Sequence, residues 1–155
     1  MRNERDIKVV ADAHVFLPAV LRHDAIYNLM IERCWRFVVS PKLRKEYEGR
    51  VTSHGKRLTD LAAEMHGLLG RNKIEGARTS QIVGTDFPKR LLNGIHSKDH
   101  HLFIAAKASG ADLVVTDEEG ILRHAIYIER ETSIKVLSSD QFVGSYGQRS
   151  VNNFH

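Results

Sequence analysis

A short apolar run near the start of the chain constrains its fold more than any other feature. Residues 7–11 read Ile-Lys-Val-Val-Ala, and the run ends directly at Asp12. Apolar, partly β-branched residues without helical spacing are typical of a strand buried in a parallel sheet. In open α/β sheets, functional groups gather beyond the carboxyl ends of such strands. Asp12 is therefore the first candidate for a functional residue.

The rest of the sequence alternates between strand patterns and helical spacing. Further strands are predicted at 35–39, 112–116 and 133–137; helices are predicted at 18–33, from Pro41 through Tyr47, at 50–70 and at 97–110, with short helices from Gly120 and Ser138. Pro18 suits a first helical turn, whereas the segment 71–98 has no clear pattern, although its apolar residues should fold onto the core. This alternation predicts an α/β domain of three layers, α/β/α, with a mostly parallel central sheet.

The size and composition fit one domain. The chain has 155 residues, of which 42% are hydrophobic, and this is enough to build a full core. We place the core at about 7–143 and expect the polar tail at 144–155 to be frayed. We see no linker, internal repeat or low-complexity tract that would mark a second domain.

The cysteine content and charge bound the compartment and the partners. The single cysteine, Cys34, excludes an intrachain disulfide and favours a reducing compartment; we expect it to be buried. The N-terminus lacks the apolar core of a signal peptide, and no stretch reaches the roughly 20 apolar residues of a membrane span. We therefore expect a cytoplasmic protein without a membrane partner. A net charge of +4 is compatible with a nucleic-acid partner, but a basic domain without such a partner would carry the same charge.

Several carboxylates occupy strand ends or first helical turns. Crowded carboxylates repel one another unless a cation lies between them, and oxygen ligands suit Mg²⁺ or Mn²⁺. Such ions hold phosphates and make a bound water nucleophilic. Each acid also has a purely structural explanation: Asp99 can favour a helix N-terminus, and Glu46 can pair with Arg50 one turn later. The acids in question are Asp12, Glu46, Asp99, Asp117 and Glu118.

The order of the motifs around these acids resembles a PIN domain. The motifs are Val-Val-Ala-Asp12, Val-Val-Ser-Pro-Lys-Leu-Arg-Lys-Glu46, Asp99-His-His-Leu-Phe-Ile-Ala-Ala and Leu-Val-Val-Thr-Asp117-Glu118, and the closing Ile134–Phe142 is similar to the end of such domains. The resemblance extends from about Ile7 to Val143. It implies a nuclease, in most members a ribonuclease, that needs Mg²⁺ or Mn²⁺ and cuts single-stranded or structured RNA. It also implies a toxin held by an antitoxin protein as one form of regulation, and we expect a homodimer.

The resemblance also implies roles for individual residues. Asp12, Glu46 and Asp99 match the first three acids of the family. The fourth acid usually follows a threonine after one intervening residue, which selects Glu118, but we keep Asp117 as a second candidate. Asp12 and Asp99 would be the main metal ligands, completed by Glu118 or Asp117, and Glu46 would act as a ligand or orient water.

Two further residues near these acids have open roles. His14 stands where the family often has asparagine, and it either donates to a phosphate or faces a neighbouring carboxylate structurally. Thr116 either bonds a water or a phosphate at the edge of the site or caps the next helix. Neither spacing nor a cysteine cluster supports a zinc site at His100 and His101.

Two other functions compete with the nuclease. One is a PIN-like module that binds RNA or a protein without cutting, a reading kept open by His14 and Glu118. The other is a phosphatase on a related sheet, but the second acid of an Asp-x-Asp pair and a glycine-rich phosphate loop are missing. Cations between the second helix and residue 90 would bind phosphates without reading bases, or they are solvated surface. These cations are Lys42, Arg44, Lys45, Arg50, Lys56, Arg57, Arg71, Lys73, Arg78, Lys89 and Arg90.

Overall fold

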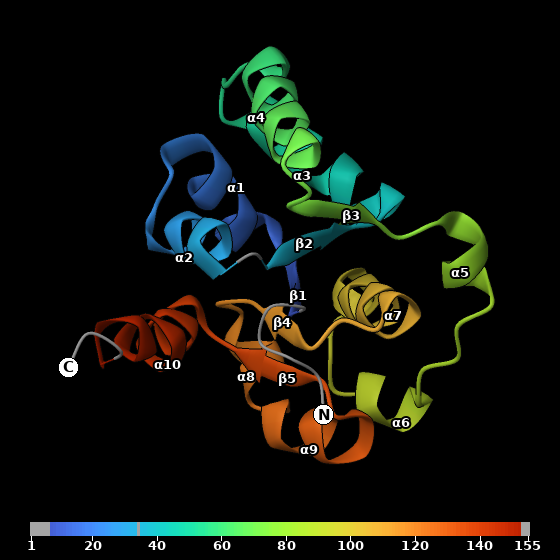
Figure 1. Ribbon diagram of the computed structural model, residues 1–155. Helices are drawn as coiled ribbons and strands as arrows, with labels where there is room; N and C mark the ends of the chain where they lie inside the picture. The colour runs from blue at the N-terminus through green and yellow to red at the C-terminus, as the bar shows by residue number, and fades with distance from the viewer. Residues whose placement is uncertain (1–6, 34, 153–155) are drawn as a thin grey trace.

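A computed structural model describes residues 7–33 and 35–152 (Figure 1). Five short strands form one sheet in the order β3-β2-β1-β4-β5, and every neighbouring pair is parallel. The strands are β1 Lys8–Ala11, β2 Arg36–Val39, β3 Ile74–Gly76, β4 Leu113–Val115 and β5 Lys135–Leu137. The predicted α/β class with a parallel central sheet is confirmed. The prediction that Cys34 is buried concerns a residue outside the described ranges.

Helices cover both faces and the ends of this sheet. They are α1 Ala13–Arg22, α2 Ala25–Arg33, α3 Pro41–Ser53, α4 Leu58–Gly70, α5 Thr79–Val83, α6 Lys89–Leu92, the 3₁₀ turn η2 Ser97–Asp99, α7 His100–Ser109, α8 Glu119–Leu122, α9 Ala125–Thr132 and α10 Ser139–Asn152. Helix α7 packs across the middle of one face, and α1, α2 and α10 lie on the other (Figure 1). Among the described residues, no helix has both the length and the apolar character needed to span a membrane.

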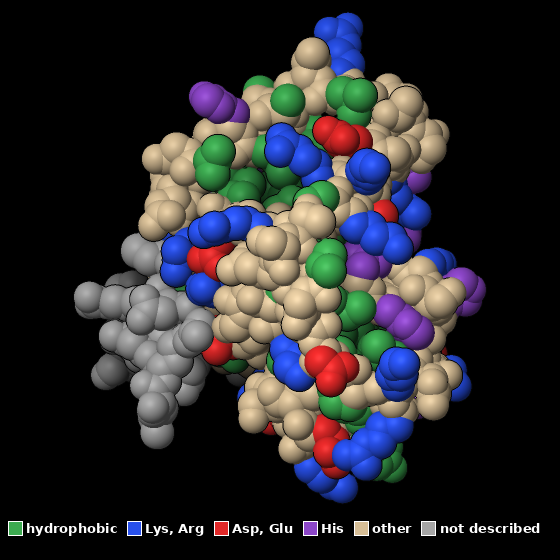
Figure 2. All heavy atoms as spheres, turned by 90° about the vertical axis from the view of Figure 1, so that its right-hand side faces the viewer, with side chains coloured by type: hydrophobic (Ala, Val, Ile, Leu, Met, Phe, Trp, Pro, Cys, Tyr) green, Lys and Arg blue, Asp and Glu red, His purple; other side chains and the backbone are tan. Residues whose placement is uncertain are grey.

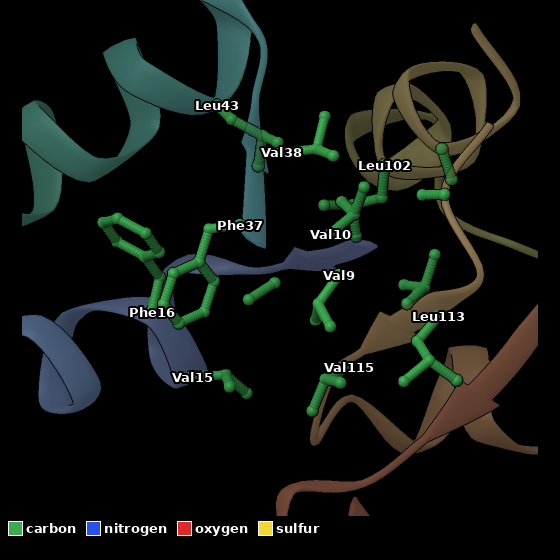
Figure 3. Packing of buried hydrophobic residues seen from close by; sticks show 14 of the residues in the cluster. Val9, Val10, Val15, Phe16, Phe37, Val38, Leu43, Leu102, Leu113 and Val115 are labelled. Carbon is green, nitrogen blue, oxygen red and sulfur yellow. The ribbon is translucent and has the colours of Figure 1, made fainter. Parts of the chain in front are cut away.

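The central strand β1 is buried on both faces. Val9 points toward Phe16 of α1, whereas Val10 points toward Leu102 of α7 (Figure 3). This alternation follows from the two-residue period of a strand, and it requires apolar side chains at consecutive positions. The backbone N–H of Asp12 donates to the carbonyl of Val115 at 3.2 Å. The carboxyl ends of β1 and β4 therefore lie side by side at one edge of the sheet.

The single helix predicted at 18–33 is two helices. Helix α1 begins at Ala13 because the Asp12 side chain accepts the backbone N–H of Val15, so Pro18 lies inside the helix and not in its first turn. His23 then adopts a left-handed conformation, with φ of 51°. The carboxylate of Asp24 accepts the N–H groups of Ile26 and Tyr27 and starts α2. An internal capping residue thus divides a continuous apolar pattern.

The chain differs from the prediction in three more places. Strand β3 and the short helices α5 and α6 lie within 71–98, which has no clear pattern in the sequence. Helix α9 follows α8 directly, beyond the predicted short helix from Gly120. The helix predicted at 50–70 is interrupted, because α3 ends at Ser53 and α4 begins at Leu58. Helix α10 extends to Asn152, and the ring of Tyr146 packs edge-on against Trp35 at 5.0 Å; the fraying of the tail stays a prediction.

Candidate active site

Asp12 lies at the carboxyl end of the central strand and is held by two hydrogen bonds. Its Oδ1 atom accepts the Val15 N–H at 3.2 Å, and its Oδ2 atom accepts the Thr116 hydroxyl. Burial raises the pKa of Asp12, the two hydrogen bonds act in the opposite direction, and the nearby charge of Asp117 raises it further. An ionised carboxylate here is poorly solvated, so a positive charge beside it would be strongly favoured.

Thr116 connects the ends of two strands. Its side chain is buried, and its Oγ1 atom both donates to Asp12 and accepts the backbone N–H of Glu118 at 3.2 Å. Thr116 therefore fixes the position of the carboxylate on one side and the start of the next helix on the other. Both roles considered from the sequence, at the edge of the site and at the helix start, are compatible with this geometry.

Glu46 reaches the same edge from α3. Its Oε1 atom lies 2.9 Å from Nε2 of His101, 55 positions further along the chain. Glu46 is therefore paired with His101, and not with Arg50 as in the structural alternative considered from the sequence. The neighbouring Tyr47 hydroxyl donates to the carbonyl of Ala11, and burial, together with the charges of Asp12 and Glu46, raises the pKa of Tyr47 well above its usual value. Helix α3 is thus anchored to the strand that carries Asp12.

His101 faces Glu46 from α7, where it is half-buried. Burial lowers the pKa of His101, although the charge of Glu46 acts in the opposite direction. A neutral ring that donates from Nε2 leaves Nδ1 as an acceptor, and this atom is buried without a hydrogen-bond partner within the described chain. The sequence singled out the His100-His101 pair only to argue against zinc, and the contact between α7 and α3 has no local signal.

Asp99 and Glu118 complete the group of acids. Asp99 ends the turn η2, directly before α7, and Glu118 precedes α8. Burial raises the pKa of Asp99, and the charges of Glu118 and Glu46 raise it further, whereas Lys98 acts in the opposite direction. The carboxylates of Glu118 and Glu46 therefore both lie within electrostatic reach of Asp99.

Asp117 is engaged in a structural contact. Its carboxylate accepts the backbone N–H of Ser139 at 2.8 Å and the Ser139 hydroxyl at 2.7 Å. These bonds tie the loop after β4 to the first turn of α10. No feature of the sequence around Ser139 indicated this pairing, which joins residues 22 positions apart.

His14 contacts an arginine. Nη2 of Arg50 lies 3.0 Å from Nδ1 of His14. Because a guanidinium only donates, Nδ1 of His14 must accept, and its ring proton then lies on Nε2. His14 also lies within charge range of the Asp12 carboxylate, so its role beside the acids stays a prediction.

The donor set fits a hard divalent cation. No group of three His, Cys, Asp or Glu side chains that could hold a metal ion occurs in the described residues. Mg²⁺, however, usually keeps several waters and is bound by one or two carboxylates together with substrate phosphates. Asp12, Asp99 and Glu118 offer oxygen ligands only, and the pKa values of Asp12 and Asp99 are raised by burial and by acidic neighbours. A divalent cation that also binds a phosphate would offset both the burial of these carboxylates and the repulsion from their acidic neighbours.

The predicted cations are dispersed. Lysine and arginine side chains are spread over the face formed by α5 and α7, with acidic side chains between several of them (Figure 2). Lys73 does not belong to this surface, because it is 7% exposed and its ammonium donates to the carbonyls of Met30 and Ile31 in α2. Its expected part in phosphate binding is therefore wrong.

Comparison with known proteins identifies the fold. No family model matches the sequence, and no curated protein matches it. A chain of the crystal structure of VapBC2 from Rickettsia felis, bound to a DNA fragment from their promoter, is similar with a TM-score of 0.54 at 15% identity. The match covers 85% of this chain and 98% of that chain. Together with the parallel sheet order, this match confirms the predicted PIN-like fold.

Proposed function

We propose that this chain, built on a PIN-like fold, is a ribonuclease that hydrolyses RNA phosphodiester bonds with Mg²⁺ or Mn²⁺. The observation that carries the proposal is the pair of half-buried carboxylates, Asp12 and Asp99, whose pKa values burial raises. The acids Glu46 and Glu118 lie within charge range of Asp99. Such a cost is seldom retained unless a cation relieves it.

Each residue of the candidate site would have a separate role in cleavage. A bound divalent cation would neutralise charge on the phosphate and activate water for attack on phosphorus. Asp12, Asp99 and Glu118 would hold it, and Thr116 keeps the Asp12 carboxylate oriented through its hydroxyl. Glu46, paired with the neutral His101, would accept a proton from the attacking water.

We also propose an antitoxin partner, a cytoplasmic location and a homodimer for this chain. The similar chain comes from a complex named VapBC2, which supports the suggestion that this chain is a toxin bound by an antitoxin protein. We place it in the cytoplasm, where a protein with one cysteine needs no oxidising environment. A homodimer is a further expectation, which sedimentation analysis would test.

Two observations favour a second candidate function. The described residues hold no ready group of three metal ligands, and Glu46 is already paired with His101. Both facts suit a PIN-like module that binds RNA or a protein without cutting it. Incubation of the protein with single-stranded RNA and Mn²⁺ separates the two functions: cleavage that EDTA stops supports the nuclease, and binding without cleavage supports the module.

The fourth acid can be identified by two isosteric changes. We expect Glu118→Gln to reduce cleavage at least about tenfold, the lower bound for loss of a group that supports a metal site. Asp117→Asn should reduce cleavage little, because its carboxylate is bound to Ser139, but it should lower the free energy of unfolding by about 1 kcal/mol. Cleavage rates and urea unfolding of both variants test this. The reverse pattern would assign the role to Asp117.

The stability of the metal-free protein should depend on pH through Asp12. The unfolded chain ionises near the ordinary pKa of 3.8, whereas burial raises the pKa in the folded protein. The folded state thus binds the proton more tightly, and its stability falls as pH rises through the raised pKa. Asp12→Asn removes this dependence. The melting temperature of the variant should therefore rise relative to that of the parent as pH increases from about 4 to neutrality.

Manganese should reverse that difference at neutral pH. A cation held at 100 times its Kd adds about 2.7 kcal/mol to the free energy of unfolding. We therefore expect Mn²⁺ to raise the melting temperature of the parent and to leave that of Asp12→Asn nearly unchanged. Equal shifts in both proteins would mean that the cation binds elsewhere.

A further inference from the structure

A pocket lined with cations lies between α1 and α3. Its polar wall consists of His14 and Arg22 from α1, Arg50 and His54 from α3 and its C-cap, and Lys56 from the following turn. Its floor is apolar and comes mainly from α1. None of the residues that line it, all in the described part of the chain, is acidic. We call it the basic pocket.

The basic pocket begins where the acidic site ends. Helix α1 starts directly after Asp12, and His14 stands in its first turn. Arg50 follows Glu46 by one turn of α3, about 6 Å along the helix at a rise of about 1.5 Å per residue. The contact of 3.0 Å between Arg50 and His14, both of which line the pocket, joins the two helices. The pocket is therefore built on the same two helices that carry Asp12 just before the start of α1 and Glu46 in α3.

The donors in the pocket suit a phosphate. Arg22, Arg50 and Lys56 carry permanent positive charge, and the tautomer of His14 described above leaves an N–H at Nε2. Guanidinium groups bind phosphate oxygens with paired N–H donors. The apolar floor offers a surface for a sugar or the face of a base, which a binding site for free inorganic ions would not need.

The volume of the basic pocket favours one unit of a polymer as its ligand over a whole small molecule. Its volume is about 180 Å³, below the roughly 300–1,000 Å³ typical of sites that enclose a whole small ligand. A single flanking nucleotide of a longer strand needs no such enclosure, because the rest of the strand is held elsewhere.

We propose that the basic pocket binds the phosphate of a nucleotide that flanks the cleaved bond in the RNA substrate, with the apolar floor against its sugar. This inference rests on the proposed function, since it assumes that RNA lies across the acids. It assigns to His14 and Arg50 a substrate-positioning role beside the acids, and it predicts a preference for substrates that extend past the cleaved bond on the side of α3.

The test uses RNA binding by the Asp12→Asn protein, so that binding is measured without cleavage. Arg22→Gln and Lys56→Gln are added together, because both side chains are accessible to solvent and both line the pocket. The matched control is Arg130→Gln in α9, remote from α1 and α3 (Figure 1). Fluorescence anisotropy with a labelled single-stranded RNA gives the affinity at several salt concentrations.

We expect the double variant to bind about tenfold more weakly, with the slope of log K against log salt less negative by about 0.7, the value for one phosphate that is no longer neutralised on a single strand. The control should match the Asp12→Asn protein in both quantities. Equal binding by all three proteins would overturn the pocket proposal, while cleavage by the parent would still support the nuclease.

Two further outcomes separate the pocket from the proposed function. RNA binding that depends on the pocket, in a protein whose parent does not cut RNA, would support the pocket and overturn the nuclease. Absence of RNA binding, together with absence of cleavage by the parent, would overturn both. If a polyglutamate peptide then binds and the double variant loses it, the pocket instead recognises an acidic protein segment.

Discussion

We expect Asp12→Asn to lose at least about a hundredfold of RNA cleavage, since even residues that only support a metal ligand typically contribute 10–100-fold. The same variant should unfold at the temperature of the parent or above it. Asparagine keeps the shape of the side chain and an oxygen that can accept the Val15 N–H, so the start of α1 is preserved. It removes the charge that a divalent cation would bind.

Stability and activity should therefore change in opposite directions at this position. Burial raises the pKa of Asp12, which means that the folded protein holds this carboxylate at a cost when it is ionised. Asparagine avoids the cost, and the Thr116 hydroxyl can turn to accept from its amide. A residue that destabilises the fold while supporting activity is the pattern expected of a functional site.

Rates of cleavage with Mn²⁺ and melting curves without metal test this expectation, with Asp86→Asn as the matched control. Asp86 is an exposed loop residue, so its substitution should leave both measurements unchanged. Cleavage that persists in Asp12→Asn would place the chemistry at another site or in a contaminant. A large fall in melting temperature would show that the carboxylate mainly stabilises the fold, and the candidate site would then lose its principal residue.

The sheet could be predicted from the sequence because its signals are local. The strands β1, β2 and β4 are runs of consecutive apolar residues, a pattern that burial on both faces requires and that few other structures produce. Ser40 and Pro41 likewise mark the start of α3, where the Ser40 hydroxyl accepts the Leu43 N–H. Strand β3 is as short as β4, but it is only partly buried, and so it lacks the run of buried apolar residues that produces such a pattern.

The pairings within the site could not be predicted in the same way. The Asp12 carboxylate and its place at a strand end follow from sequence, but its bond to Thr116 joins residues 104 positions apart. Likewise, Glu46 has Arg50 as its local partner on a helix, yet α7 brings the buried His101 closer. Local spacing identifies which side chains reach an edge of the sheet. The packing of helices from distant segments decides which of them meet.

The fold itself should depend most strongly on Phe16. This side chain is fully buried, stacks on Tyr47 with ring centroids 4.1 Å apart, and meets the edge of Phe37 at 5.1 Å. It therefore joins α1, α3 and β2 beneath the residues that position Asp12. We expect Phe16→Ala to lower the free energy of unfolding by about 3–5 kcal/mol, through lost burial and the cavity left behind.

Such a loss is a large part of the roughly 5–15 kcal/mol that stabilises a typical domain. Tyr127→Ala is the matched control, because that aromatic ring is 56% exposed and its removal should change the free energy by no more than about 0.5 kcal/mol. Urea unfolding followed by the fluorescence of Trp35 measures both variants. A cost below about 1 kcal/mol for Phe16→Ala would mean that this ring is not part of a close-packed core. Since Asp12 caps the start of α1, that result would also leave the position of the carboxylate without its main packing support.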